Sequence, residues 1–173
     1  MLVALTGTPG TGKSSVAAEL ERRGYTIVLL DRFAEEHKLI SGFDEARGTK
    51  EVDVEALDRE LRVPAKLAFL VAHYAHLLRV NLAIVLRCRP KVLADRLRAR
   101  GWAERKVREN VEAEVIDAIT QEAVGRLPFV YEIDTTSTTT EAATAAVLEI
   151  LQGRVQGREP GHLDWSDEVL TWY

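Results

Sequence analysis

LVALTGTPGTGKSS, residues 2–15, is the stretch of this sequence that decides the fold. Its apolar run at 2–5 predicts a buried strand, and the residues from Lys13 onward predict an amphipathic helix. Between them, residues 7–14 match the pattern G-x-x-x-x-G-K-S. A glycine-rich turn alone is a weak signal, but the complete pattern between a strand and a helix predicts a phosphate-binding loop, or P-loop.

The residue types of this loop suit a polyphosphate ligand. Gly10 and Gly12 let the backbone turn with its N–H groups inward, and the helix that follows adds free N–H groups and the positive end of its dipole. We expect Lys13 to bridge the outer phosphates and the Ser14 hydroxyl to bind the Mg2+ ion that accompanies them. The loop therefore predicts nucleotide binding.

The composition fits a single globular domain. The chain has 173 residues, of which 46% are hydrophobic, and its formal net charge of -4 argues against a basic nucleic-acid binder. No run of eighteen apolar residues and no basic, apolar leader occur, so neither a membrane span nor secretion is indicated. The single cysteine, Cys88, fits a reducing, cytoplasmic location and a small apolar packing role.

The rest of the chain alternates between strand and helix patterns. Four further strands are predicted by apolar runs at 25–30, 67–71, 82–86 and 129–133. Helices are predicted over 32–38, 91–100, 104–124 and 140–151, and from residue 54. This order predicts an α/β fold, a three-layer sandwich with a five-stranded parallel sheet like that of the P-loop nucleoside monophosphate kinases. The guanine-reading sequence N-K-x-D of GTPases is absent.

Two chemistry-bearing residues follow predicted strands at the carboxyl edge of the sheet, where open α/β folds bind ligands. Asp31 is either a ligand or the N-cap of the helix after it, and one side chain can do both. His73 could orient a water molecule or contact a phosphate. His73 and His76 lack a third ligand at metal spacing, so a zinc site is not indicated.

A polar, glycine-containing insertion at 39–54 is longer than a plain connection. Its place beside the predicted phosphate site suggests a substrate-binding flap. Asp53 closes the insertion as the predicted N-cap of the next helix.

Basic residues on the predicted helix 91–100 suggest a mobile lid. Arg96 and Arg100 are four residues apart on one face, the helix stops at Gly101, and Lys106 follows the break. Guanidinium groups on a closing lid would grip the transferring phosphate only when closed. The alternative is an ordinary solvated helix surface. Arg87 and Arg89, which leave the fourth strand, are weaker candidates for this task.

Later segments are interpreted as structural. We expect 104–124 to be one long helix, with Asp117 solvated and the buried face formed by Val107, Val111, Val115 and Ile119. Residues 153–161 are interpreted as a flexible link. The aromatic residues Trp102, Trp165, Trp172 and Tyr173 either pin their segments to the core or contact a base or a partner.

Taken together, these segments resemble the archaeal branch of the atypical adenylate kinases, the adenylate kinase isoenzyme 6 type. Members of that family double as maturation factors of the small ribosomal subunit. The resemblance spans nearly the whole chain and is most specific after the lid. The matching segments are 5–15, Asp31 with 33–34, 52–54, 73–77, 84–90, 96–102, 106–114, 134–136 and 164–166.

The resemblance implies a broad-specificity nucleoside monophosphate kinase that moves the terminal phosphate of ATP to AMP, with a slower ATPase activity. It implies one P-loop kinase domain over 1–173, with a monophosphate flap at about 30–53 and a lid at about 100–110. The implied ATP-binding residues are Gly10, Gly12, Lys13, Ser14, Ser15 and Arg100. It also implies binding of a small-subunit platform ribosomal protein, the universal protein numbered eleven, and of the pre-ribosomal small subunit.

One position departs from the family pattern. The family usually carries an Asp or Glu two positions before the histidine that corresponds to His73, and this chain has Val71 there. Loss of a carboxylate near a metal commonly weakens the site by about 10- to 100-fold. Either Asp31 compensates, or turnover is low and the chain acts as an assembly factor that is switched by nucleotide.

Overall fold

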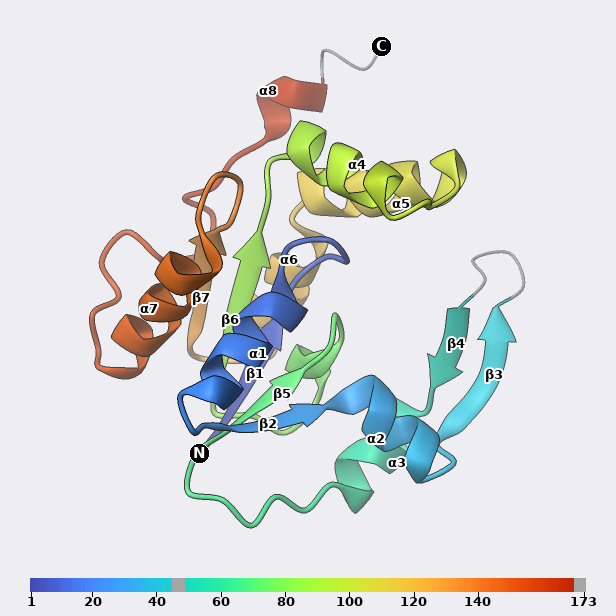
Figure 1. The fold of residues 1–173 in the computed structure, drawn as a ribbon, viewed down its shortest axis with the longest axis vertical. Helices are drawn as coiled ribbons and strands as arrows, with labels where there is room; N and C mark the ends of the chain where they lie inside the picture. The colour runs from blue at the N-terminus through green and yellow to red at the C-terminus, as the bar shows by residue number, and fades with distance from the viewer. Residues whose placement is uncertain (45–48, 170–173) are drawn as a thin grey trace.

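The computed structural model describes residues 1–44 and 49–169, and at its centre lies one parallel sheet covered by helices on both faces (Figure 1). The strand order is β2-β5-β1-β6-β7. The sheet strands are β1 (Leu2–Thr6), β2 (Thr26–Leu29), β5 (Ala68–Val71), β6 (Leu82–Arg87) and β7 (Val130–Asp134). The predicted three-layer α/β sandwich with five parallel strands is confirmed.

The helices follow the strands in alternation. They are α1 (Lys13–Arg22), α2 (Leu30–Glu36), α3 (Val54–Glu60), the 3-10 turn η1 (Ala75–Leu77), α4 (Pro90–Ala99), α5 (Glu104–Val115), α6 (Ala118–Val124), α7 (Thr140–Leu151) and α8 (Ser166–Val169). Among residues 1–44 and 49–169, none of these helices has both the length and the apolar character that a membrane crossing requires.

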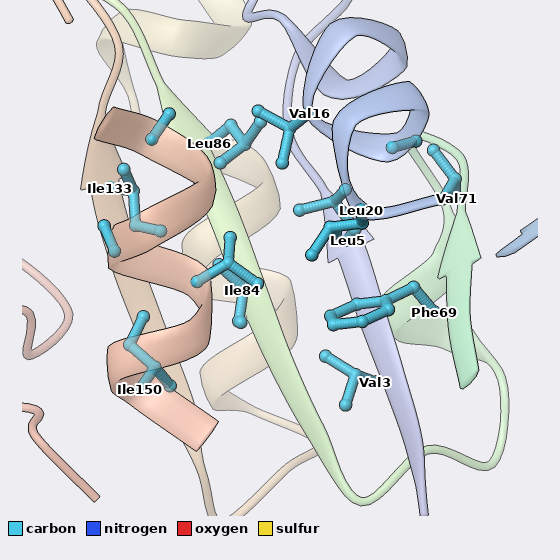
Figure 2. Close-up of a cluster of buried hydrophobic side chains, with 14 residues drawn as sticks. Val3, Leu5, Val16, Leu20, Phe69, Val71, Ile84, Leu86, Ile133 and Ile150 are labelled. Atoms are coloured by element: carbon cyan, nitrogen blue, oxygen red, sulfur yellow. The ribbon is translucent and has the colours of Figure 1, made fainter. Parts of the chain in front are cut away.

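Helices α1 and α7 cover one face of the sheet (Figure 2). Val16 and Leu20 of α1 and Ile150 of α7 point at the apolar side chains of the strands beneath them. Those strand residues are Val3, Leu5, Phe69, Val71, Ile84, Leu86 and Ile133. Alternate residues of the same strands, Ala4, Leu70 and Val85 among them, face the second cluster with Leu30, Leu57 and Ala123. Strands covered on both faces read as continuous apolar runs, which is why the sequence shows them clearly.

Strand β2 is an edge strand, because it pairs only with β5. Its end residues Thr26 and Leu29 are exposed, and Leu29 keeps 45% of its surface accessible. The apolar run at 25–30, which suggests a buried strand, therefore forms a strand that is only partly buried. An apolar run does not reveal whether one or two neighbours will cover it.

The insertion after α2 is an antiparallel hairpin. Strand β3 (Ile40–Asp44) pairs with β4 (Thr49–Val52), and Phe43 lies opposite Lys50. The hairpin lies next to α2 and α3, away from the central sheet (Figure 1). A hydrophobicity pattern does not predict these two strands, because few of the hairpin side chains are buried.

Two predictions for the second half of the chain are corrected. The helix expected over 104–124 is two helices, because Asp117 adopts a left-handed conformation with φ of 53° between α5 and α6. Residues 153–161, interpreted as a flexible link, are bonded to β7. The N–H of Glu132 donates to the carbonyl of Arg158 at 2.8 Å, and the N–H of Gly161 donates to the Glu132 carboxylate at 3.0 Å.

Candidate nucleotide-binding site

The P-loop joins β1 to α1 at the carboxyl edge of the sheet. Gly7, Gly10 and Gly12 have φ values of 133°, 97° and 98°, which glycine adopts readily and other residues rarely do. A Cβ on Gly10 would lie 2.7 Å from a methyl group of Leu93 in α4. Glycine is therefore required there by the backbone conformation and by the close approach of α4.

Lys13 extends across the loop that precedes it. Its Nζ donates to the carbonyls of Gly7 at 2.6 Å and Thr8 at 3.0 Å. Burial lowers the Lys13 pKa to about 8, while the carboxylates of Glu114 and Asp31 act in the opposite direction. The amine is thus a partly desolvated cation at the place where the sequence predicts the outer phosphates.

The two serines after Lys13 face different hollows. Ser15 lines a pocket with the P-loop glycines, Arg96, Arg100 and the threonines before and at the start of α7. Ser14 lines a second hollow between α1, β2 and α2. Both side chains are exposed. The start of α1 therefore offers one serine hydroxyl to each hollow.

The two arginines expected on a lid, Arg96 and Arg100, differ in their contacts. Arg96 is tied down: its NH2 nitrogen donates to the carbonyls of Thr135 at 2.7 Å and Thr136 at 3.1 Å. Arg100 is exposed at the end of α4 and lines the same pocket. Its backbone N–H donates to the carbonyl of Leu97 at 3.1 Å, but its guanidinium forms no hydrogen bond or ion pair with any residue of 1–44 or 49–169. Lys106 places its amine 4.5 Å from the ring centre of Trp102. Arg100 is thus the cation of this group that is available to a ligand.

Asp31 lies in the first turn of α2, and Leu29 holds the N-cap position, so the N-cap alternative for Asp31 was wrong. Its Oδ1 accepts a hydrogen bond from the Tyr74 hydroxyl at 2.8 Å. Burial, and then the negative charge of Asp31, raise the Tyr74 pKa, so the hydroxyl remains a proton donor. Asp31 also acts electrostatically on Lys13 and His73. Tyr74 therefore fixes the carboxylate beside the P-loop cation.

His73 follows β5 at this edge, and its side chain is exposed. The protein atoms around the ring desolvate it, and together with the charge of Lys13 they lower the His73 pKa. The ring is therefore neutral at pH 7. Its backbone carbonyl accepts a hydrogen bond from the Thr6 hydroxyl at 3.0 Å, which anchors the segment to β1.

Two other positions from the sequence analysis, Asp53 and Val71, have structural surroundings. Asp53 caps α3 as expected, since its Oδ1 accepts from the N–H of Ala56 at 2.8 Å. Val71 is buried in the apolar cluster beneath α1. Within the described ranges, no three His, Cys, Asp or Glu residues form a group that could hold a metal ion.

His76 is a buried structural histidine. Its Nδ1 lies 3.2 Å from the Thr6 hydroxyl and its Nε2 lies 3.0 Å from a Glu122 carboxylate oxygen. Burial lowers the His76 pKa and Arg126 adds to this, while Glu122 acts in the opposite direction. In the folded protein the ring therefore stays neutral until the pH falls below the ordinary pKa of a histidine.

We expect the protein to lose stability as the pH falls below about 6.5. A histidine pKa that is lower in the folded than in the unfolded chain means that the unfolded chain binds more protons, so acid favours unfolding. His76→Gln should flatten the decline in the free energy of unfolding between about pH 7.5 and 5.5. His37→Gln, at an exposed histidine, is the control for the substitution itself. Urea unfolding at each pH measures the decline, and equal slopes for the parent and His76→Gln would contradict the expectation.

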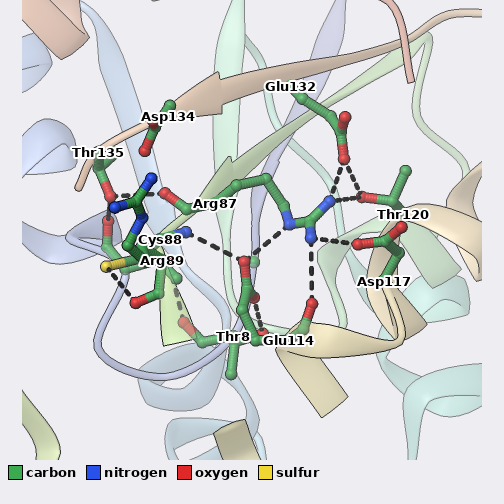
Figure 3. Close-up of polar contacts among 12 residues, drawn as sticks. Thr8, Arg87, Cys88, Arg89, Glu114, Asp117, Thr120, Glu132, Asp134 and Thr135 are labelled. Carbon is green, nitrogen blue, oxygen red and sulfur yellow. Dashed lines mark hydrogen bonds and ion pairs between the residues drawn. The ribbon is translucent and has the colours of Figure 1, made fainter. Parts of the chain in front are cut away.

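A buried ionic network lies next to the P-loop (Figure 3). Arg87, at the end of β6, is 1% exposed and pairs with the carboxylates of Glu114, Glu132 and Asp117. Burial acts to lower the Arg87 pKa, but these carboxylates outweigh it and raise the pKa. Arg87 is thus occupied inside the protein and was wrongly considered for phosphate contact. The expectation that Asp117 is solvated was wrong for the same reason.

Sequence reasoning missed Glu114 and Thr8. Glu114 is 2% exposed and lies at the last turn of α5, where its Oε2 accepts from the Thr8 hydroxyl of the P-loop. One signal was available: Glu114 is seven residues after Val107 and three after Val111, so it belongs to the buried face of the helix. An acidic residue on an apolar stripe indicates a buried partner.

The C-terminal segment packs against the same region. Trp165 is buried, and the guanidinium of Arg89 lies 5.7 Å from its ring centre. Trp165 therefore pins its segment, as one of the two alternatives expected. Cys88 is buried as expected, and burial raises its thiol pKa to about 11. Trp172 and Tyr173 lie outside the described residues.

A P-loop between β1 and α1, at the carboxyl edge of a five-stranded parallel sheet, defines the chain as a P-loop protein with a kinase-type fold. Residues 3–117 match the family model described as an AAA domain. The chain is 45% identical over 172 residues to a protein of Archaeoglobus fulgidus named "Putative adenylate kinase", and the match covers 98% of this chain and 94% of that protein. A protein of the same name from Pyrococcus abyssi is 38% identical over 180 residues, with 99% and 97% covered. The chain belongs to the family that these archaeal proteins form.

Among solved structures, the shikimate kinase of Bacteroides thetaiotaomicron is similar, with a TM-score of 0.61 at 17% identity. The similarity covers 88% of this chain and 98% of that one. At this identity the comparison establishes the shared fold.

Proposed function

We propose that the protein is a nucleoside monophosphate kinase of the adenylate kinase isoenzyme 6 type, which transfers the terminal phosphate of ATP to AMP and similar acceptors. The observation that carries the proposal is the placement of Lys13 and the free Arg100 around a P-loop that opens onto two hollows. The names of the archaeal relatives support the same activity. One kinase domain over 1–173 contains both substrate sites, and a cytoplasmic location is part of the proposal.

The pocket that contains Ser15 and Arg100 would hold ATP. The N–H groups of Gly10 and Gly12 and the first N–H groups of α1 would bind its phosphates, and Lys13 would exchange its two carbonyl partners for phosphate oxygens. Arg100, on a lid at about 100–110, would stabilise the charge that develops on the transferring group. The phosphates of ATP would thus contact residues of the P-loop and α1 on one side and Arg100, at the end of α4, on the other.

The acceptor would bind on the other side of Ser14, under a flap at about 30–53. We assign Asp31 and Asp53 to the acceptor side, and His73 to orienting a water or phosphate oxygen near it. Arg96 would shape the donor pocket through the loop after β7. An oxygen of the acceptor phosphate attacks the γ-phosphorus, the bond from that phosphorus to the bridging oxygen breaks, and ADP leaves, so ATP and AMP give two ADP.

Oxygen donors from α1 and α2 fit a Mg2+ ion. Ser14 offers an exposed hydroxyl, and Asp31 offers a carboxylate held beside Lys13, both hard oxygen donors of the kind that Mg2+ takes. Such an ion neutralises phosphate charge during transfer. Val71 supplies no carboxylate, so we assign to Asp31 the role of the missing acidic residue.

The second part of the proposal is a slower ATPase activity that serves late maturation of the small ribosomal subunit. The resemblance supports it, and Val71 favours it, because a weakened metal site lowers turnover more than it lowers nucleotide binding. The partner would be the platform ribosomal protein numbered eleven, within the pre-ribosomal small subunit. Absence of co-elution of the purified chain with that protein, with and without ATP, would remove this part.

Product formation from ATP with each monophosphate in turn tests the main proposal, with ATP alone as the control. We expect ADP to form faster with AMP than with ATP alone, because transfer to an acceptor adds to hydrolysis. Equal rates with and without every monophosphate would contradict the kinase proposal and leave only hydrolysis.

A further inference from the structure

We propose that Glu114 is a positioning residue for phosphoryl transfer, which holds the P-loop in its working conformation through the side chain of Thr8. The inference rests on the proposed function, because the loop that Glu114 positions is the loop assigned to ATP. Glu114 touches no part of the pocket itself, so it would act through Thr8 and not on the substrate.

The contact between the two residues is buried and specific. Thr8 and Glu114 are each 2% exposed, and the Thr8 hydroxyl donates to Glu114 Oε2 at 2.5 Å. The two residues are 106 positions apart in the chain. A hydrogen bond to a carboxylate in such surroundings is stronger than a neutral one and fixes its geometry.

Thr8 transmits this contact to the lysine of the loop. Its backbone carbonyl accepts from Lys13 Nζ at 3.0 Å, from the Thr11 hydroxyl at 2.8 Å and from the Thr11 N–H at 3.2 Å. The side chain and the main chain of one residue thus join Glu114 to the cation and to the turn of the loop. A displacement of Thr8 therefore moves the groups that would meet the phosphates.

Glu114 is in turn fixed by the sheet. Its Oε1 accepts from Arg87 Nε at 2.7 Å and from the backbone N–H of Cys88 at 3.0 Å. Arg87 also donates to the backbone carbonyl of Glu114 at 3.0 Å (Figure 3). The carboxylate therefore connects the P-loop with the end of β6 and with α5.

Helix α4, which packs against α5, also contacts the P-loop. Gly10 lies against Leu93 and Leu97, where a Cβ would come within 2.7 and 3.0 Å of their methyl groups. Leu97 and the α5 residue Val107 belong to one apolar cluster that joins the two helices. The α4–α5 hairpin, which carries Arg100, is therefore attached to the P-loop at Gly10 by packing and at Thr8 by a hydrogen bond.

Thr8→Val removes the hydroxyl while keeping the shape of the side chain. We expect it to lower kcat for transfer to AMP by about 10- to 100-fold, because a small misplacement of reacting groups has an effect of this size. KM for AMP should stay within about threefold, since the acceptor side does not touch Thr8. Thr8→Ser keeps the hydroxyl and should restore kcat to within about threefold of the parent.

Thr120→Val is the matched control. Thr120 is 3% exposed, and its hydroxyl donates to a carboxylate oxygen of Glu132 at 2.7 Å in the same network, without a contact to the P-loop. We expect its midpoint of urea unfolding to fall about as far as that of Thr8→Val, while kcat stays within about twofold of the parent. Equal losses of kcat in Thr8→Val and Thr120→Val would overturn the proposal, as would a kcat within about twofold of the parent for Thr8→Val.

A second readout separates this inference from the proposed function. Titration with a fluorescent ADP analogue and Mg2+ measures binding without any transfer. We expect Thr8→Val and Glu114→Gln to weaken binding by at least about fivefold and Thr120→Val by less than about twofold. If the parent transfers phosphate to no monophosphate, the kinase proposal fails, and the inference about Glu114 is judged on this titration alone. Unchanged affinity in both Thr8→Val and Glu114→Gln would then overturn it.

Discussion

Lys13→Ala is expected to lower kcat for phosphoryl transfer by about 10²- to 10³-fold, which is a loss of about 3 to 4 kcal/mol of transition-state stabilisation. The amine is held against the P-loop carbonyls of Gly7 and Thr8, at the position assigned to the outer phosphates. It acts as a preorganised charge, because the loop fixes it before the reaction begins. No other described residue of the chain supplies a cation from within the loop.

A coupled assay with ATP and AMP measures this effect. Lys66→Ala is the control, since Lys66 is exposed and precedes β5 at the amino end of the strand, while the site lies at the carboxyl end. Its kcat should equal that of the parent. A Lys13→Ala rate within a few-fold of the parent would contradict the assignment of Lys13.

The largest effect on stability is expected for Arg87→Met. This change leaves the buried carboxylates of Glu114 and Glu132 without their cation, and breaking a buried pair in this way costs about 3 to 5 kcal/mol. For a chain of this size the melting temperature should fall by on the order of 10 °C. The methionine fills much of the same volume, so the loss of stability comes from the missing charge more than from altered packing.

Arg79→Ala provides the comparison. Arg79 forms an ion pair with Asp58 at 2.7 Å, but 73% of its side chain is exposed. Removing a surface pair of this kind changes the free energy of unfolding by about 0 to 1 kcal/mol. Calorimetry of the two variants and the parent measures the difference. Equal losses in Arg87→Met and Arg79→Ala would show that burial of the Arg87 network does not increase its contribution to the free energy of unfolding.

The buried ionic network and the P-loop meet at helix α5. Helix α5 shares an apolar cluster with α4, which carries the free Arg100, and it places Glu114 against the P-loop and Arg87. The residues that stabilise the fold and those proposed to organise the loop are therefore in direct contact. Variants of this region need both a stability and an activity measurement.

The sequence by itself determined the fold class and the position of the P-loop between β1 and α1. Buried parallel strands appear as apolar runs. The P-loop is a local pattern, because its glycines shape the backbone of one short segment and Lys13 bonds to carbonyls of that segment. Asp53 as the cap of α3 was predictable for the same reason, since a cap acts on an N–H three residues away. Features of this kind depend on neighbours in the chain.

Only the tertiary structure decided which charged side chains are free and which are occupied. Arg87 and Arg100 have the same chemistry and lie near the same edge, yet Arg87 is paired with three carboxylates inside the protein and Arg100 is exposed. The partners of Arg87 come from α5, β7 and the break at Asp117, up to 45 positions away in the chain. The link between Thr8 and Glu114 spans 106 positions. Pairing across such distances depends on how the helices pack on the sheet, and a one-dimensional pattern does not contain that information.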